Sequence, residues 1–201
     1  MADTNSIQRI CVFCGSNPGT RSVYTAVAQQ LGKAIVSHGM GLVYGGGSIG
    51  LMGIIADAVL KEKGNVIGVI PHALSSREFA HPGLTELRMV SSMHERKAMM
   101  AELSDAFIAM PGGFGTFDEL FEILTWAQLG IHTKPIGLLN VEGYFDLLLA
   151  FISHVLQERF IQTKHRQLIT TTSNDPEKLL QSLIHHKPPK NIPQLIDWKE
   201  A

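Results

Sequence analysis

Two short segments of the sequence combine charged residues in an order that could do chemistry. In the first, Arg96 and Lys97 are adjacent within Met93-His94-Glu95-Arg96-Lys97, at the start of a helix predicted over 93–103. Two cations in the first turn oppose the helix dipole, which costs about 0.3–1 kcal/mol each. A bound phosphate or carboxylate would reverse that cost, and an arginine can hold such an anion at two points. The alternative is a solvated surface turn in which Glu95 balances the cations.

The second segment is a row of carboxylates that follows a glycine-rich loop. Asp118, Glu122 and Thr125 share one face of a helix predicted over 116–129, and Glu119 lies at the edge of that face. The remaining positions are apolar nearly all round, so the polar row must face a cavity, a partner or water, and the helix is expected to pack against a second subunit. Carboxyl groups beside an apolar cleft tend to have raised pKa values, which suits acid–base work.

Two other residue pairs have a structural explanation beside a functional one. Thr116-x-x-Glu119 is the capping-box pattern, in which the glutamate folds back onto the start of its own helix. Arg77 and Glu78 follow a predicted strand, where an exposed ion pair would explain them. Because ligands bind beyond the carboxyl ends of parallel strands, Arg77 and Glu78 also remain candidates for ligand contact.

Glycines gather at three junctions between a predicted strand and the following helix, residues 15–19, 45–50 and 111–116. Gly45, Gly47 and Gly50 satisfy G-x-G-x-x-G, but the next strand ends in Pro71-His72 and supplies no acidic residue for a dinucleotide ribose. No Gly-Lys-Ser/Thr of a P-loop follows any of the three. Each loop alone could simply make a tight turn. Together they favour a phosphate-bearing ligand held by backbone N–H groups.

The elements that must position these residues alternate along the chain. Strands are predicted at 8–14, 41–44, 65–70, 87–90, 106–110, 135–139 and 167–171, and helices at 22–38, 50–63, 93–103, 116–129, 144–158 and 175–185. This alternation predicts an α/β fold: a single Rossmann-like domain over 1–186, with a mostly parallel sheet of about seven strands and helices on both faces. Residues 187–201 are expected to form an extended C-terminal tail.

Composition narrows the class of protein. The 201 residues carry a net charge of −1, which argues against a nucleic-acid partner, and 45% hydrophobic residues are enough for a sizeable core. No apolar run is long enough to span a membrane, and residues 1–6 lack the pattern of a secretory signal. Cys11 and Cys14 lie in a strand-like run with their side chains on opposite faces, so we expect two buried thiols in a cytoplasmic protein rather than a redox or metal pair.

Residues 111–119 fit the motif P-G-G-x-G-T-x-x-E, and residues 93–97 fit M-H-x-R-K. With these motifs the sequence resembles the LONELY GUY (LOG) family, the cytokinin riboside 5′-monophosphate phosphoribohydrolases. The resemblance continues through Cys14-Gly15-Ser16, Tyr44-Gly45-Gly46-Gly47, Arg77-Glu78 and Thr125-Trp126-Ala127-Gln128-Leu129-Gly130, and so runs from about Ile10 to the last helix.

The resemblance implies a homodimer that hydrolyses N6-modified AMP to a free base and ribose 5-phosphate, without a cofactor or a metal. It implies that Arg96 and Glu119 are the catalytic pair. The nucleotide contacts that it implies are Glu78, Lys97, Gly113, Phe114, Gly115, Thr116, Phe117, Asp118 and Thr125. From the glycine loops we add Ser16, Gly46 and Gly47 as candidates for holding the 5′-phosphate.

Two positions depart from the family pattern and bear on substrate fit. Asp118 stands where a second glutamate is common, and Phe114 replaces the more usual tyrosine. Glu119 would activate water or stabilise charge at the anomeric carbon, and Arg96 would hold the ribose phosphate or assist the departing base. Two alternatives stay open at this point: a hydrolase of unmodified AMP or other monophosphates, and a non-catalytic nucleotide or molybdenum-cofactor carrier.

Overall fold

The computed structural model describes residues 7–75, 80–189 and 192. Its strands are β1 (Arg9–Phe13), β2 (Gly41–Tyr44), β3 (Val66–Pro71), β4 (Glu86–Val90), β5 (Ala106–Ala109), β6 (Ile136–Leu139) and β7 (Ile169–Thr172). Its helices are α1 (Ser22–Ser37), α2 (Gly50–Lys61), α3 (His72–Ser75), α4 (Met93–Glu102), α5 (Phe114–Gln128), η1 (Val141–Gly143), α6 (Asp146–Gln157), α7 (Thr163–Arg166) and α8 (Pro176–Ile184).

The seven strands form one parallel sheet in the order β4-β3-β2-β1-β5-β6-β7. This confirms the predicted α/β architecture, and each predicted strand and long helix is present with ends that differ by at most two residues. The short helices α3, η1 and α7 were not predicted. Within the described part of the chain, no helix combines the length and apolar composition needed to cross a membrane.

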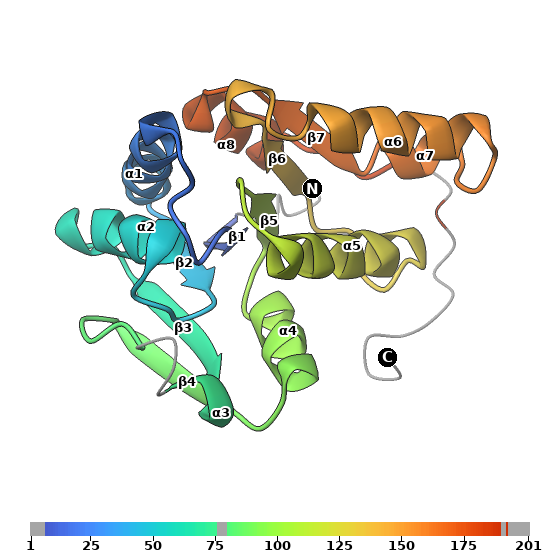
Figure 1. The fold of residues 1–201 in the computed structure, drawn as a ribbon. Coiled ribbons are helices and arrows are strands. Elements are labelled where there is room, and N and C mark those ends of the chain that lie inside the picture. Colours follow the sequence, from blue (N-terminus) through green and yellow to red (C-terminus); the bar gives the residue numbers. More distant parts are fainter. Residues whose placement is uncertain (1–6, 76–79, 190–191, 193–201) are drawn as a thin grey trace, which may run out of the picture.

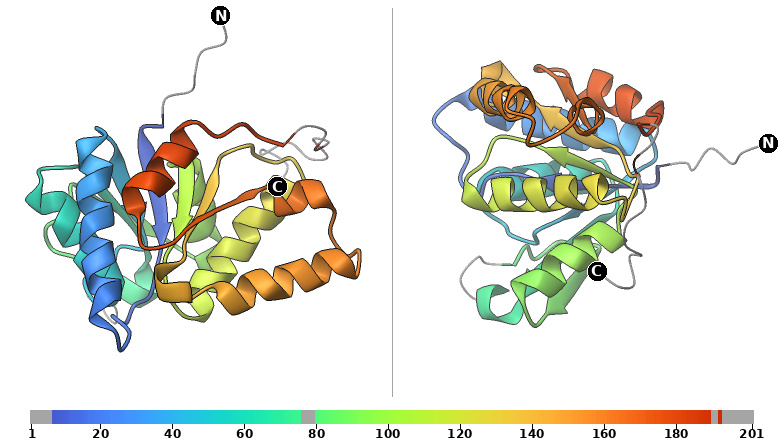
Figure 2. Two further views of the ribbon diagram at one scale, coloured as in Figure 1. Left: turned by 90° about the horizontal axis from the view of Figure 1, so that it is seen from above. Right: turned by 90° about the vertical axis from the view of Figure 1, so that its right-hand side faces the viewer.

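The core has two halves, one on each face of the sheet (Figures 1 and 2). Ile10 and Val12 of β1 point to the side covered by α1, α2 and α8, whereas Cys11 and Phe13 point to the side covered by α4, α5 and α6. This alternation follows from the two-residue period of a strand. Cys11 and Cys14 lie in different halves, both buried and both free, as predicted. Burial raises the pKa of both thiols, which keeps them protonated.

Strand order places a topological switch point between β1 and β5. From β1 the chain builds the sheet outwards through β2 and β3 to β4, and then returns to the other side of β1 with β5. The loops that leave the carboxyl ends of β1 and β5 therefore diverge, and the crevice between such loops is where open α/β sheets bind ligands.

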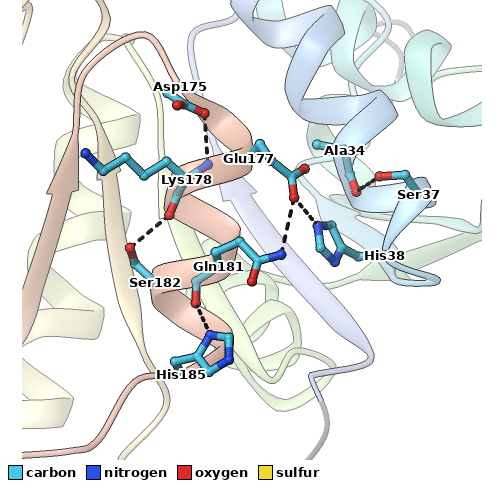
Figure 3. A network of polar contacts seen from close by, with 9 residues as sticks. All are labelled: Ala34, Ser37, His38, Asp175, Glu177, Lys178, Gln181, Ser182 and His185. Atoms are coloured by element: carbon cyan, nitrogen blue, oxygen red, sulfur yellow. Dashed lines mark hydrogen bonds and ion pairs between the residues drawn. The ribbon is translucent and has the colours of Figure 1, made fainter.

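Helix α8 closes the first half of the core and is tied to α1 by polar contacts (Figure 3). It begins where Asp175 accepts a hydrogen bond from the Lys178 N–H at 2.9 Å, with Pro176 as the first helical residue. Glu177 then contacts Nε2 of His38, at the end of α1, at 2.7 Å. Because α8 also packs on β6 and β7, it joins this edge of the sheet to α1.

Candidate active site

The crevice at the switch point is lined by two of the glycine-rich loops. The Gly15 N–H donates to the Pro111 carbonyl at 3.0 Å, which joins the loop after β1 to the loop after β5. A cavity of about 290 Å³ opens beside this contact. The cavity is lined by the exposed Ser16 and Tyr144 and by the half-buried Tyr24.

The N-terminus of α5 faces this crevice. The helix starts at Phe114, with Gly113 as an N-cap that offers no side-chain hydrogen bond. Thr116 is therefore the third helical residue, so the capping box considered as an alternative explanation of Thr116 and Glu119 does not form. The N–H groups of the first turn have no acceptor within the helix. A Cβ atom at Gly113 or Gly115 would meet nothing within 4 Å, so the space beyond these backbone groups is open, as an anion site requires.

Helix α4 approaches the same region from the other side, and its start is well defined. Ser92 is the N-cap and its hydroxyl accepts from the Glu95 N–H at 3.1 Å. The Glu95 carboxylate reaches back to the N–H of Ser91 at 2.8 Å and to the Ser91 hydroxyl. These hydrogen bonds lower the pKa of Glu95. The Ser-x-x-Glu signature at 92–95 could have revealed this cap from the sequence.

Arg96 is buried at the carboxyl ends of β2 and β3. Only 6% of it is exposed, which excludes the solvated surface turn considered from the sequence. Its Nε donates to the Val69 carbonyl at 3.1 Å and its Nη2 to the Gly45 carbonyl at 3.2 Å. A Cβ atom at position 45 would lie 2.0 Å from Nη2, so the close approach of the guanidinium requires glycine there.

Lys97 bridges α4 and α5. Its Nζ lies 3.0 Å from Oδ2 of Asp118 and 3.2 Å from Oε1 of Glu122. Burial of the ammonium lowers the pKa of Lys97, but the hydrogen bonds to both carboxylates outweigh this, and the net pKa is raised. Lys97 thus stays charged and holds two members of the predicted carboxylate row beside α4.

Glu119 and Arg96 are both buried against the centre of the sheet. Glu119 is 9% exposed, on the side of α5 next to the carboxylate row. The pKa of the Cys11 thiol is raised mainly by burial and then by the charge of Glu119, while the charge of Arg96 lowers it. Arg96 and Glu119 come from α4 and α5, the two helices that Lys97 bridges.

Comparisons with known proteins assign this arrangement to a family. A family model described as "Possible lysine decarboxylase" matches residues 52–183. A probable cytokinin riboside 5′-monophosphate phosphoribohydrolase of Oryza sativa subsp. japonica is 51% identical over 96% of this chain and 78% of its own length. A cytokinin riboside 5′-monophosphate phosphoribohydrolase of Arabidopsis thaliana is 49% identical over 94% of this chain and 88% of its own. The chain belongs to the LOG family.

Solved structures agree with the fold of this LOG-family chain. The molybdenum cofactor carrier protein of Chlamydomonas reinhardtii matches with a TM-score of 0.68 at 21% identity, over 89% of this chain and 99% of its own. The molybdenum cofactor binding protein of Rippkaea orientalis gives a TM-score of 0.66, also at 21% identity, over 88% and 97%. At this identity the likeness concerns the fold alone.

The other residues predicted from the LOG motifs are placed in several ways. The Phe114 side chain is 95% exposed beside the open helix N-terminus. The Phe117 ring instead packs edge-on against the buried Phe145, at 6.2 Å between centroids. Thr125 donates to the Phe121 carbonyl at 2.7 Å and lines an apolar groove between α5 and α6 rather than the crevice. Glu78, with Arg77, lies outside the described residues.

Gly46 and Gly47 are buried and hold the segment that follows residues 76–79. The Gly46 carbonyl accepts from the His81 N–H at 3.0 Å, and Gly47 forms an isolated bridge with Ala80. His81 also contacts Asp57 of α2 at 3.0 Å. In this LOG-family chain the glycine loop at 45–50 thus holds the segment at Ala80 and His81. The loops at 15–19 and 111–116 line the open crevice at the switch point.

Three residues near the site were missed from the sequence: Tyr24, His81 and Tyr144. None belongs to a motif with a fixed spacing, and each contributes through a contact with a distant segment. No group of three His, Cys, Asp or Glu side chains among the described residues could hold a metal ion.

Proposed function

We propose that this protein hydrolyses the N-glycosidic bond of N6-modified AMP, a cytokinin riboside 5′-monophosphate, to a free base and ribose 5-phosphate. The observation that carries the proposal is the position of Arg96 and Glu119. Both are buried: Arg96 is held by the Val69 and Gly45 carbonyls at β3 and after β2, and Glu119 lies in the second turn of α5, the helix with the open N-terminus. Relatives of about 50% identity over most of the chain carry the name of this activity.

The order of groups along α5 suits a nucleoside monophosphate. The backbone N–H groups of residues 113–115 would hold the 5′-phosphate at the positive end of the helix dipole. Glu119 lies five residues after Phe114, about 1.4 turns and roughly 7.5 Å along the axis at 1.5 Å per residue, where the ribose of such a ligand would lie. The carboxylates of Asp118 and Glu122 would then border the base, on the side facing Lys97.

In the proposed reaction a water oxygen bonds to C1′ as the bond from C1′ to the base nitrogen breaks. Positive charge develops on the ribose, as in glycoside cleavage. Glu119 takes a proton from the water or stabilises this charge, and the departing base gains a proton. Arg96 is already held by the Val69 and Gly45 carbonyls, so its remaining donors have a fixed direction from which to bind the ribose phosphate or assist the base.

Lysine decarboxylation, the activity in the description of the family model, fits the residues poorly. That reaction uses pyridoxal phosphate bound as a Schiff base to a lysine. Such a lysine is activated when its pKa is lowered. Lys97 follows Arg96 on α4, but its two carboxylate partners raise its pKa and keep it charged.

Chromatography of reaction products tests the proposal. The protein is incubated in parallel with N6-isopentenyl-AMP, AMP, GMP and CMP, and released base is measured. Base from isopentenyl-AMP alone is the expected result. Equal release from AMP would instead indicate a hydrolase of unmodified nucleotides, and tight binding without release would indicate a carrier.

We further propose that the protein is a cytoplasmic homodimer. The outer faces of α5 and α6 present Phe121, Leu147 and Phe151 to solvent. Phe121 and Phe151 also line an apolar groove of about 120 Å³. A second copy of the chain would cover this surface by two-fold symmetry. Two buried thiols without a disulfide are consistent with a reducing compartment.

A further inference from the structure

Tyr144 connects the turn after β6 to the glycine loop after β5. Its hydroxyl donates to the Gly112 carbonyl at 2.5 Å, across 32 residues of sequence. We propose that Tyr144 is a positioning residue, which fixes the Gly112–Gly113 peptide so that the Gly113 N–H faces the 5′-phosphate of the substrate. This inference rests on the proposed function and names the residue that orients its phosphate site.

The geometry of a peptide bond explains how one hydroxyl can do this. In a planar trans peptide the C=O and the following N–H point in opposite directions. Holding the Gly112 carbonyl toward Tyr144 therefore aims the Gly113 N–H to the other side, at the start of α5. If this peptide rotated by half a turn, the carbonyl oxygen would face the phosphate and repel it. Because Gly112 and Gly113 lack side chains, their own backbone torsions permit either orientation of this peptide.

Neighbouring carbonyls of the loop are held by the backbone itself. The Pro111 carbonyl accepts from the Gly15 N–H at 3.0 Å, and the Gly113 carbonyl accepts from the Phe117 N–H at 3.2 Å. The Gly112 carbonyl lies between these two and takes its hydrogen bond from a side chain. The orientation of its peptide thus depends on Tyr144.

Tyr144 is itself aimed by a strained turn. Glu142 has φ 51° and Gly143 has φ 75°, two consecutive residues in the left-handed region. A non-glycine residue keeps this conformation only where its surroundings fix it. Glu142 is fixed by Arg21, at 2.8 Å from its carboxylate, and by Asn174, whose side-chain oxygen accepts from the Glu142 N–H at 2.8 Å.

The ring of Tyr144 is fixed from two sides. It packs edge-on against the fully buried Phe145 at 5.0 Å and against Tyr24 at 6.0 Å between centroids. A ring held in this way has little freedom to lose when its hydroxyl binds. Tyr144 and Gly112 also line the same cavity at the switch point, so the hydrogen bond forms part of the wall of the crevice.

The variant Tyr144→Phe removes the hydroxyl and keeps the ring. We expect KM for N6-isopentenyl-AMP to rise about five- to tenfold, the factor for one neutral hydrogen bond, while kcat changes less than twofold. The inhibition constant of ribose 5-phosphate should rise by the same factor. The rate with N6-isopentenyladenosine, which has no phosphate, should not change. A purely structural role would lower the melting temperature and leave the preference for the phosphorylated substrate intact.

Tyr44→Phe is the matched control. The Tyr44 hydroxyl is buried in the core under α1 and α2, with no hydrogen-bond partner among the described residues, so its loss should leave KM and the inhibition constant unchanged. Equal KM values for wild type and Tyr144→Phe would overturn the inference. If the wild type releases no base from any nucleotide, the proposed function fails, and calorimetric binding of ribose 5-phosphate to the wild type and the variant still decides the role of Tyr144.

Discussion

Arg96 and Glu119 are charged side chains that the fold buries, and burial of a charge is costly unless it is compensated. For Arg96 the compensation is visible, because two backbone carbonyls accept from its guanidinium. These contacts also fix the direction of the guanidinium plane before any ligand arrives. A group oriented in advance needs no rearrangement in the transition state, and this is how fixed charges contribute most to catalysis.

Glu119→Gln tests the acid–base role at this scale. The amide has nearly the same shape but carries no charge and takes up no proton, so we expect kcat for base release to fall by about 10²–10⁴-fold. The melting temperature should change little. Glu102→Gln, at the exposed end of α4, makes the same chemical change outside the cleft and should keep wild-type activity. Turnover within threefold of wild type in Glu119→Gln would remove Glu119 from the catalytic pair.

Among the elements, α4 matters most for the site because it carries both Arg96 and Lys97. Its first turn is held by Ser92 and Glu95, and Arg96 and Lys97 follow Glu95 directly. The cap fixes the residue at which α4 starts, and therefore the positions of Arg96 and Lys97 on the helix, in addition to stabilising it.

Ser92→Ala removes the cap of α4. The Glu95 N–H loses its acceptor, and we expect the free energy of unfolding in urea to fall by about 1 kcal/mol. Ser37→Ala, in the last turn of α1, removes a hydroxyl that donates back to the Ala34 carbonyl and caps no N-terminus, so it should cost clearly less. Equal losses for the two variants would show that the Ser92 hydroxyl does not stabilise α4.

At the level of elements, sequence patterns predicted the seven strands and six long helices because apolar periodicity marks each of them. The start of α5 was displaced by two residues, because Gly113 and Phe114 lack the Ser, Thr, Asp or Asn that usually announces an N-cap. The helices α3, η1 and α7 have only three or four residues, which is too short for periodicity to register.

For the site, the sequence motifs could indicate which segments form it, but not which residues of different segments contact one another. The contact of Lys97 with Asp118 joins residues 21 apart, and that of Tyr144 with Gly112 joins residues 32 apart. Such pairs are set by strand order, since β5 returns beside β1, and no local spacing encodes them. The positions of Ser16 and Gly113 on one crevice follow from the same return.

For the whole molecule, stability should depend on pH through His132. This side chain is buried against Phe107, with its Nε2 3.1 Å from the Ile123 carbonyl and its Nδ1 accepting from the Lys134 N–H. Burial is the main cause that lowers the pKa of His132 from 6.5 to about 4, and the nearby Lys134 lowers it further. The folded protein thus keeps His132 neutral where the unfolded chain would protonate it.

Because the folded pKa is the lower one, this contribution to stability is complete above pH 6.5 and is lost as the pH falls toward 4. The loss by pH 4 should reach roughly 3 kcal/mol, at 1.4 kcal/mol per pKa unit. Urea unfolding of wild type and His132→Gln at pH 7, 6, 5 and 4 measures it. The glutamine can still donate to Ile123 but does not titrate, so the two stabilities should converge on acidification. Parallel curves would show that His132 is not buried as a neutral group.

The exposed apolar surface on α5 and α6 is the basis of the proposed dimer interface. Leu147 is 86% exposed and Phe151 59% exposed, and the groove beside them is lined mainly by apolar side chains. An exposed apolar surface of this kind is typical of a binding interface, and we propose that a second copy of the chain covers it. The groove lies between α5 and α6, whereas Lys97 joins α5 to α4.

Phe151→Asp should convert a dimer into a monomer, because a two-fold interface would bury two copies of the unpaired carboxylate near its centre. Light scattering gives the mass, with about 44 kDa expected for the wild type from twice 22.0 kDa and 22.0 kDa for the variant. Ile184→Asp adds the same charge at an exposed apolar position on α8, which covers the opposite face of the sheet, and should remain dimeric. A monomeric wild type would refute the proposed interface. A dimeric Phe151→Asp with an unchanged dissociation constant would move the interface to another surface, and Ile184→Asp would then be the first variant to compare.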